Sequence, residues 1–283
     1  MVYIVPLTGQ NGSPSGTPRM NKNSKILVED VSKEFGSDKS QVQALKNINL
    51  VVSEGEFVSI VGPSGCGKST LLYMLGGFVP PSSGRLLADG QPIVAPGIDR
   101  GIVFQEYALF PWLTVFDNIA YGLEMTGMPA AKREKAVEHY VSLIGLKGFE
   151  RRYPRELSGG MKQRVALART FAYGPSILLL DEPFGALDSL TRETMQDELQ
   201  RLWRTTGKTI VMVTHDVGEA VYLSNRVCVM SQRPGRIIEE FSIDLDRSGA
   251  REDVVLSDAY TAIHNAVWVS VRRQVTHAPG IAP

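Results

Sequence analysis

The sequence predicts an α/β fold with a mostly parallel β-sheet and a helical insertion. Short, nearly all-apolar runs alternate with helical stretches, a pattern typical of a sheet that helices cover on both faces. A glycine-rich segment beginning at Gly62 separates a strand-like run from a helix-like one. Between residues 118 and 156 the strand pattern disappears, so we expect a mostly helical subdomain there.

The elements follow in order along the chain. Ordered structure is expected from Lys25, because Ile26, Leu27 and Val28 begin an apolar strand. Further strand-like runs lie at residues 56–61, 101–104, 177–180, 209–214 and 226–230. A helix is expected at residues 69–75, ended by two glycines, and another at 132–146, where apolar residues recur at helical spacing.

These patterns predict three regions. Residues 8–24 are polar and rich in Gly, Pro and Ser, so residues 1–24 are expected to form a disordered extension. Residues 25–245 form the folded domain, with its helical subdomain at about 106–160. Residues 246–283 form a helical tail, in which apolar side chains recur every three or four positions, at Leu256, Tyr260, Ile263, Val267 and Val271. This tail either packs back on its own domain or binds a partner.

Composition excludes several classes of protein. Thirty Lys and Arg residues balance thirty Asp and Glu residues, so no charge excess favours nucleic acid. The two cysteines, Cys66 and Cys228, suit neither a disulfide framework nor a metal site, which favours a reducing compartment. No run reaches the roughly 20 apolar residues of a membrane span, and the N-terminus lacks a secretory signal pattern. Any membrane association is therefore expected through a partner.

The glycine-rich segment has the spacing of a phosphate-binding loop. It reads Gly62-Pro63-Ser64-Gly65-Cys66-Gly67-Lys68-Ser69, followed by Thr70, and it lies between a strand and a helix. The glycines let successive N–H groups turn toward phosphate oxygens, and the helix N-terminus adds partial positive charge. Lys68 is expected to reach the β- and γ-phosphates, and the Ser69 hydroxyl to bind Mg²⁺. Cys66 occupies a variable position of the loop and has no separate role.

Two acids end a later apolar strand. Residues 177–180 run directly into Asp181 and Glu182, and such a strand delivers its last side chains to the carboxyl edge of the sheet, where ligands bind. Asp181 is expected to hold Mg²⁺, and Glu182 to act as general base on the attacking water. An apolar run before Asp-Glu is common by itself; the phosphate loop upstream makes the prediction strong.

A second glycine turn distinguishes this chain from other phosphate-loop proteins. Leu157-Ser158-Gly159-Gly160-Met161-Lys162-Gln163 heads an expected helix that reaches Arg169, and its amides could also receive a phosphate. One nucleotide does not need two such receptors in one subunit. Two copies arranged head to tail would use both, which predicts a dimer closed around ATP.

These stretches resemble the ATP-binding-cassette (ABC) family over roughly residues 26–238. The resemblance implies a RecA-like phosphate-loop NTPase core with an antiparallel β edge and a helical subdomain. It identifies residues 157–163 as the signature motif, in which Ser158, Gly159, Gly160 and Gln163 would contact nucleotide. It further implies that Gln105 contacts Mg²⁺ and relays to a membrane partner, and that His215 touches the γ-phosphate. Asp188 would be the D-loop aspartate of the nucleotide site. Phe35 would stack on adenine. A histidine at a strand end is otherwise more often structural.

Within that family, the ATPases of nitrate, sulfonate and taurine importers are the most similar. Residues 109–115, 159–164 and 233–237 carry this resemblance. It implies a peripheral ATPase dimer on the cytoplasmic face of the inner membrane, working with an integral permease and, indirectly, a solute-binding protein. The region from Gln105 to Tyr121 would receive the permease. Its aromatic residues either pack in the core or form that docking surface; they are Phe110, Trp112, Phe116 and Tyr121.

The resemblance also implies how such an ATPase would work. Hydrolysis would open the closed dimer and switch the permease between its two faces. Three alternatives remain: a soluble ABC ATPase of DNA repair or the ribosome, an exporter ATPase, and a phosphotransferase kinase. The single cassette without a long heptad tract argues against the first. The detached cassette argues against the second, and the stretch at residues 157–163 against the third.

Overall fold

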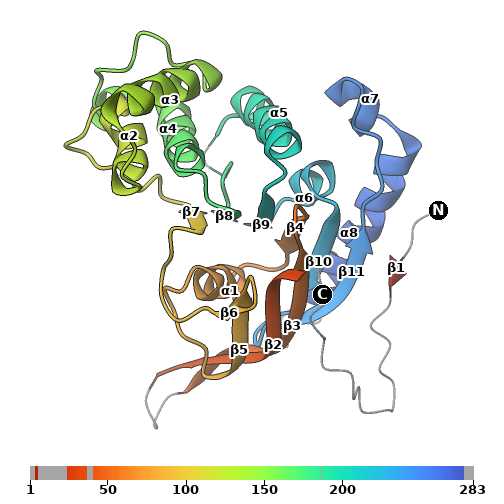
Figure 1. Cartoon of the computed structure of the whole chain (residues 1–283). Helices are drawn as coiled ribbons and strands as arrows, with labels where there is room; N and C mark the ends of the chain where they lie inside the picture. Colours follow the sequence, from red (N-terminus) through yellow and green to blue (C-terminus); the bar gives the residue numbers. More distant parts are fainter. Residues whose placement is uncertain (1–3, 6–23, 37–40, 186, 277–283) are drawn as a thin grey trace. The chain divides into compact units, whose positions relative to one another are not determined.

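The computed structural model describes residues 4–5, 24–36, 41–185 and 187–276 (Figure 1). The chain divides into two compact units. The first consists of Met1–Gly97 and Gly207–Pro283, and the second of Ile98–Thr206. The mixed, mostly parallel sheet and the separate antiparallel sheet confirm the predicted α/β fold class.

The first unit carries parallel strands that follow the predicted apolar runs. Its neighbouring strands lie in the order β1 (Ile4–Val5), β11 (Ile237–Ser242), β10 (Arg226–Met230), β4 (Phe57–Val61) and β9 (Thr209–Thr214). β10, β4 and β9 are parallel, whereas β11 and β1 run antiparallel at the edge. Every residue of β4 and β9 is buried, which explains why these strands are nearly all apolar.

The antiparallel sheet of the first unit has the strand order β3 (Val42–Ser53), β2 (Ser24–Phe35), β5 (Ser83–Ala88) and β6 (Gln91–Pro92). β5 and β6 join through Asp89 and Gly90, which both have positive φ, as the tight turn of a hairpin requires. The long β3 strand had not been located from the sequence, because polar residues interrupt its apolar alternation.

Four helices complete the described part of the first unit: α1 (Lys68–Leu75), α6 (Val217–Leu223), α7 (Arg251–Val255) and α8 (Asp258–Thr276). Ile263 and Val267 of α8 are buried in a cluster with residues of α6, β10 and β11. Tyr260 and Val271 pack against the same cluster. The tail helix therefore packs back on its own unit, the first of the two interpretations.

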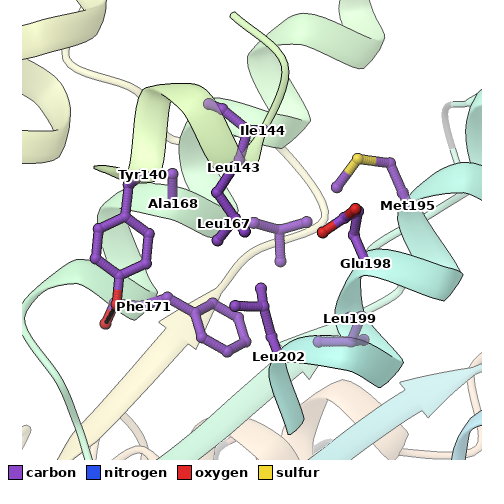
Figure 2. A pocket seen from close by; sticks show the side chains of 10 residues that line it. All are labelled: Tyr140, Leu143, Ile144, Leu167, Ala168, Phe171, Met195, Glu198, Leu199 and Leu202. Carbon is purple, nitrogen blue, oxygen red and sulfur yellow. Dashed lines mark hydrogen bonds between the residues drawn. The ribbon is translucent and has the colours of Figure 1, made fainter. Parts of the chain in front are cut away.

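The second unit combines a parallel strand pair, β7 (Arg100–Val103) and β8 (Ile177–Asp181), with helices. These are α2 (Val115–Met125), α3 (Ala130–Leu143), the 3₁₀ turn η1 (Pro154–Glu156), α4 (Gly159–Ala172) and α5 (Ser189–Thr206). Apolar side chains of α2, α3 and α4 form one core. Figure 2 shows side chains of α3, α4 and α5 facing a cavity of about 20 Å³.

Within the N-terminal extension, residues 1–24, the structure describes residues 4–5 and residue 24. Ile4 and Val5, within the region where we expect disorder, form β1, which pairs with Phe241 and Glu240 of β11. Two β-branched residues can add to an open sheet edge in this way. The rest of the extension, up to residue 23, lies outside the described residues. Among the described helices, none is long and apolar enough to cross a bilayer.

Candidate functional site

The phosphate loop, residues 62–69, connects β4 to α1. Gly65 and Gly67 have φ values of 73° and 108°, which suit glycine and would strain other residues. Gly67 is the N-cap of α1, and no described side chain caps this helix, so its first N–H groups point toward the loop. The buried Lys68 donates from Nζ to the carbonyls of Gly62 (2.8 Å) and Pro63 (3.0 Å). The loop thus concentrates N–H donors and one ammonium group.

Close packing holds this loop in shape. A Cβ atom added to Gly62 would lie 2.9 Å from the carbonyl oxygen of Met230, and one added to Gly67 would lie 2.6 Å from Leu45. Cys66 is buried, and burial raises the pKa of its thiol, so it stays protonated and packs as an apolar group. Glycine is therefore needed at these positions for space as well as for backbone freedom.

Two other predicted residues belong to the same unit. β4 and β9 are parallel neighbours with Val61 opposite Thr214, so Gly62 and His215 follow adjacent strands at one carboxyl edge. The His215 side chain is exposed. Phe35 ends β2 with 44% of its surface exposed, and the Lys33 ammonium lies 5.0 Å from its ring centroid. An exposed aromatic ring is available for stacking.

A hydrogen-bond network orders the turn that carries His215. The buried Thr214 hydroxyl donates to the Glu219 carboxylate (2.8 Å) and accepts from the Asp216 N–H (3.0 Å). The Asp216 carboxylate in turn caps α6 by accepting from the Glu219 N–H (3.0 Å). Glu219 was not predicted from the sequence, although it is a carboxylate within a stretch of mostly apolar, buried residues.

In the second unit, the ends of β7 and β8 bring three predicted residues together. Val103 lies opposite Leu180, so Gln105 and the acids Asp181 and Glu182 follow the same edge of this strand pair. Gln105 Nε2 donates to Glu182 Oε2 at 3.3 Å. Asp181 is 1% exposed. Glu182 adopts a left-handed backbone with φ of 45°, a strained conformation of the kind that concentrates at functional sites.

The donor set suits Mg²⁺. Carboxylate, amide and hydroxyl oxygens are the ligands that this hard cation prefers, and it usually takes one or two carboxylates while phosphates and water complete the shell. Within the second unit, Asp181 offers a carboxylate oxygen and Gln105 an amide oxygen. Ser69, in the first unit, offers a hydroxyl oxygen. Among the described residues no group of three or more His, Cys, Asp or Glu side chains forms a metal site by itself. The chemistry therefore fits a phosphate-bound Mg²⁺ rather than a protein-only cage.

The signature stretch forms the start of α4. Ser158 is the N-cap, and its Oγ accepts from the Met161 N–H at 3.3 Å. An open groove of about 400 Å³ is lined by Ser158, Gly159, Gly160, Met161, Arg164, Asp188 and Thr191. Gln163, predicted to contact nucleotide, is instead 2% exposed inside the unit. The groove therefore offers the α4 N-terminus and both glycine amides to an incoming anion.

Asp188 has a structural role beside this groove. Its Oδ1 accepts from the Thr191 N–H at 3.0 Å at the start of α5. That backbone hydrogen bond is the main reason why the pKa of its carboxyl is lowered, and the positive charge of Arg164 contributes less. Asp188 therefore stays ionised at the groove.

The aromatic residues after Gln105 form a partly exposed patch, here called the aromatic patch: Phe110, Trp112 and Tyr121. The Phe110 ring lies 5.7 Å from Trp112 and 4.7 Å from Tyr121, centroid to centroid. Trp112 is 71% exposed and Tyr121 41% exposed. Phe116, by contrast, packs against the helical core. Trp112 and Tyr121 are thus too exposed to serve only as core.

Two residues that support this patch were missed from the sequence. The buried Asn118 donates from Nδ2 to the carbonyls of Phe110, Leu113 and Thr114, and its Oδ1 accepts from the Phe110 N–H. Arg169 donates to the Ala108 carbonyl at 2.8 Å and lies 5.2 Å from the Phe110 ring centroid. Asn118 could have been noticed in the sequence, because it is a polar residue on the apolar stripe of α2.

Comparisons with known proteins show the family of the chain. The sequence profile of the ABC transporter family matches residues 45–185, which include the phosphate loop, the signature stretch and both acids. A taurine import ATP-binding protein of Burkholderia pseudomallei is 46% identical over 254 residues, covering 88% of this chain and 98% of that protein. A nitrate import ATP-binding protein of Synechocystis is 50% identical over 220 residues, covering 78% and 83%.

Solved structures give the same result. A dimeric ATP-binding cassette in a post-hydrolysis state, bound to ADP and phosphate, superposes with a TM-score of 0.70 at 35% identity. The match covers 77% of this chain and 99% of that one. With identity, coverage and fold in agreement, the chain belongs to the ABC transporter family and is one of its ATP-hydrolysing cassettes.

Proposed function

We propose that the chain is the ATPase subunit of an importer for a small anion of the nitrate, sulfonate or taurine type. It works as a head-to-tail dimer on the cytoplasmic face of the membrane, bound to an integral permease. A solute-binding protein delivers the solute to that permease. The similarity to taurine and nitrate import ATP-binding proteins supports the importer class. The solute class follows from that similarity alone, because the ATPase residues described here have no transported molecule to recognise.

The ATP site is assigned from the chemistry at the two strand edges. In the first unit, residues 62–70 hold the phosphates with Lys68, Phe35 stacks on adenine, and His215 contacts the γ-phosphate. The Ser69 hydroxyl of the loop is a Mg²⁺ ligand. In the second unit, Asp181 and Gln105 are Mg²⁺ ligands, and Glu182 accepts a proton from the attacking water. Bound Mg²⁺ would neutralise phosphate charge as the terminal bond breaks.

The observation that carries the dimer is the open groove at the start of α4. It presents the amides of Gly159 and Gly160, the Ser158 hydroxyl and a helix N-terminus, all suited to phosphate, in a molecule that already has one phosphate loop. The ATP bound to the phosphate loop of a second subunit can supply the phosphate for this groove. Asp188 lies at the same groove, where it would face the partner. Dimeric cassettes among the similar structures support this arrangement.

A test of the catalytic assignment uses Glu182→Gln. This variant keeps the shape of the side chain but removes the base, so ATP turnover should fall by about 10²- to 10⁴-fold while ATP binding persists. The matched control is Glu193→Gln, the same change at an exposed site on α5. Light scattering in saturating MgATP should then show a dimer for Glu182→Gln. Turnover near the parent rate would remove Glu182 as the base, and a strict monomer even with the permease would refute the dimer.

The permease assignment depends on the aromatic patch. Trp112→Ala removes its most exposed ring and should weaken copurification with the membrane permease, while nucleotide affinity stays unchanged. Trp268→Ala on α8 is the matched control, because this tryptophan is also exposed, at 44%, but lies outside the patch. Equal loss of permease and nucleotide binding at Trp112 would contradict the assignment, as would loss of the permease at Trp268 alone.

A further inference from the structure

The turn between β10 and β11, residues 231–236, has no part in the function proposed so far. β10 is the parallel neighbour of β4, with Val229 opposite Val61. The β10–β11 turn and the phosphate loop therefore follow adjacent strands at the same edge, within one unit. The turn reads Ser-Gln-Arg-Pro-Gly-Arg.

Arg233 connects the turn to the loop directly. Its guanidinium donates to the carbonyl oxygen of Gly65 from Nη2 at 3.0 Å and from Nε at 3.3 Å. Both hydrogen bonds converge on one backbone oxygen, and each is assisted by the positive charge of the donor. Gly65 is one of the left-handed glycines of the loop, so the contact fixes the part of the loop that has the most backbone freedom.

The turn is itself rigidly held, so it can serve as an anchor. The Gly235 N–H donates to the Ala44 carbonyl at 2.9 Å, and the Lys46 N–H donates to the Gly235 carbonyl at 3.0 Å. Within the turn, Ser231 Oγ accepts from the Arg236 N–H at 3.0 Å. Gly235 also approaches the loop so closely that an added Cβ would lie 2.1 Å from the Cys66 carbonyl oxygen.

The direction of the Gly65 carbonyl matters for anion binding. In a trans peptide the carbonyl and the next N–H point in opposite directions. Holding the Gly65 oxygen against Arg233 therefore turns the Cys66 N–H toward the inside of the loop, where it donates to the Pro63 carbonyl over a long 3.4 Å. A phosphate oxygen would replace so weak a bond at little cost.

We propose that Arg233 is a positioning residue for the phosphate loop: it holds the Gly65–Cys66 peptide in the orientation that binds phosphate, without touching the nucleotide. Ordering the loop before binding lowers the entropic cost of binding. The inference rests on the proposed ATP site at residues 62–70, but not on the dimer, the permease or the solute. It gives the β10–β11 turn a role in ATP affinity rather than in the chemical step.

The test compares Arg233→Met with Arg236→Met. Both remove one exposed arginine from the same turn, but only Arg233 contacts the loop. Losing a charge-assisted hydrogen bond of this kind should raise the MgATP dissociation constant by roughly 10- to 100-fold, and the KM with it. The kcat at saturating ATP should stay within about twofold, because no contact to the reacting atoms is lost. Arg236→Met should leave both constants unchanged, and Arg233→Lys should fall between Arg233→Met and the parent.

Three further measurements separate the possible failures. Thermal unfolding of each variant shows whether the fold is intact, and amide hydrogen exchange of the apo protein should rise at residues 65–68 only in Arg233→Met. Lys68→Ala tests the ATP site: normal MgATP binding by that variant would refute the site itself. If Lys68→Ala loses binding while Arg233→Met keeps the parent affinity, the site stands and the inference is wrong. An equal effect of Arg236→Met, or a fall in kcat with KM unchanged, would also overturn it.

Discussion

Replacing Thr214 with valine tests the network that orders the His215 turn. Valine has nearly the shape of threonine but lacks the hydroxyl, which donates to Glu219 and accepts from the Asp216 N–H. Both Thr214 and Glu219 are buried. The change therefore leaves a buried carboxylate and a backbone N–H each short of one partner.

The magnitude follows from these two hydrogen bonds. A bond to a charged group contributes about 1.5–3 kcal/mol and a neutral one about 0.5–1.5 kcal/mol. The methyl group that replaces the hydroxyl recovers less than about 1 kcal/mol. We expect a net loss of roughly 2–3 kcal/mol in the free energy of unfolding. At about 2–4 °C per kcal/mol, the Tm should fall by about 5–10 °C.

The matched variant is Thr214→Ser, which keeps the hydroxyl and loses only a methyl group. It should cost about 1 kcal/mol and lower the Tm by about 2–4 °C. Scanning calorimetry of the three proteins in one buffer measures the difference. Because His215 directly follows, ATP turnover should also fall in the valine variant and persist in the serine variant. A valine variant with a Tm equal to or above that of the serine variant would refute the reasoning.

Three further predictions concern other parts of the chain. Burial raises the pKa of the Cys66 and Cys228 thiols, so little reactive thiolate forms even at pH 8.5. A thiol reagent should therefore label both cysteines quickly in urea but only slowly in the folded chain. Fast labelling of the folded chain would contradict the burial of these cysteines. Asn118→Ala removes the hydrogen bonds that hold residues 110–114 and should speed limited proteolysis there; unchanged cleavage would argue against this support. Val267 is buried in the α8 interface, so Val267→Ala should lower the Tm by about 4–8 °C. Val269 is exposed, so Val269→Ala should hardly change the Tm. Equal shifts in Tm would mean that α8 does not pack as described.

Local patterns predicted the parts of the fold that depend on one stretch of chain. β4, β8, β9 and β10 are almost fully buried, so each had to be a short apolar run that the sequence displays directly. The phosphate loop and the signature turn are equally local, because their glycines, cap and following helix lie within a few residues of one another. For the same reason, Glu182 could be proposed as the base from its place after β8.

Contacts between distant residues could not be predicted in this way. β2 and β3 pair with repeated register shifts, and their polar residues conceal the alternation, so β3 was not located from the sequence. Gln163 lies within the signature stretch but turns inward, because its position on α4 faces the interior of its unit.

The sequence by itself determined that this chain is an α/β cassette with a phosphate loop, a signature turn and two strand-end acids, since each of these depends on neighbouring residues. Only the tertiary structure decided what supports them. Arg233 and Gly65 are separated by 168 positions, and the hydrogen bond between them exists because two parallel strands end side by side. The need for glycine in the phosphate loop depends on the local backbone and is visible in the sequence. The residue that hydrogen-bonds to the Gly65 carbonyl depends on which strands lie side by side, and only the tertiary structure shows it.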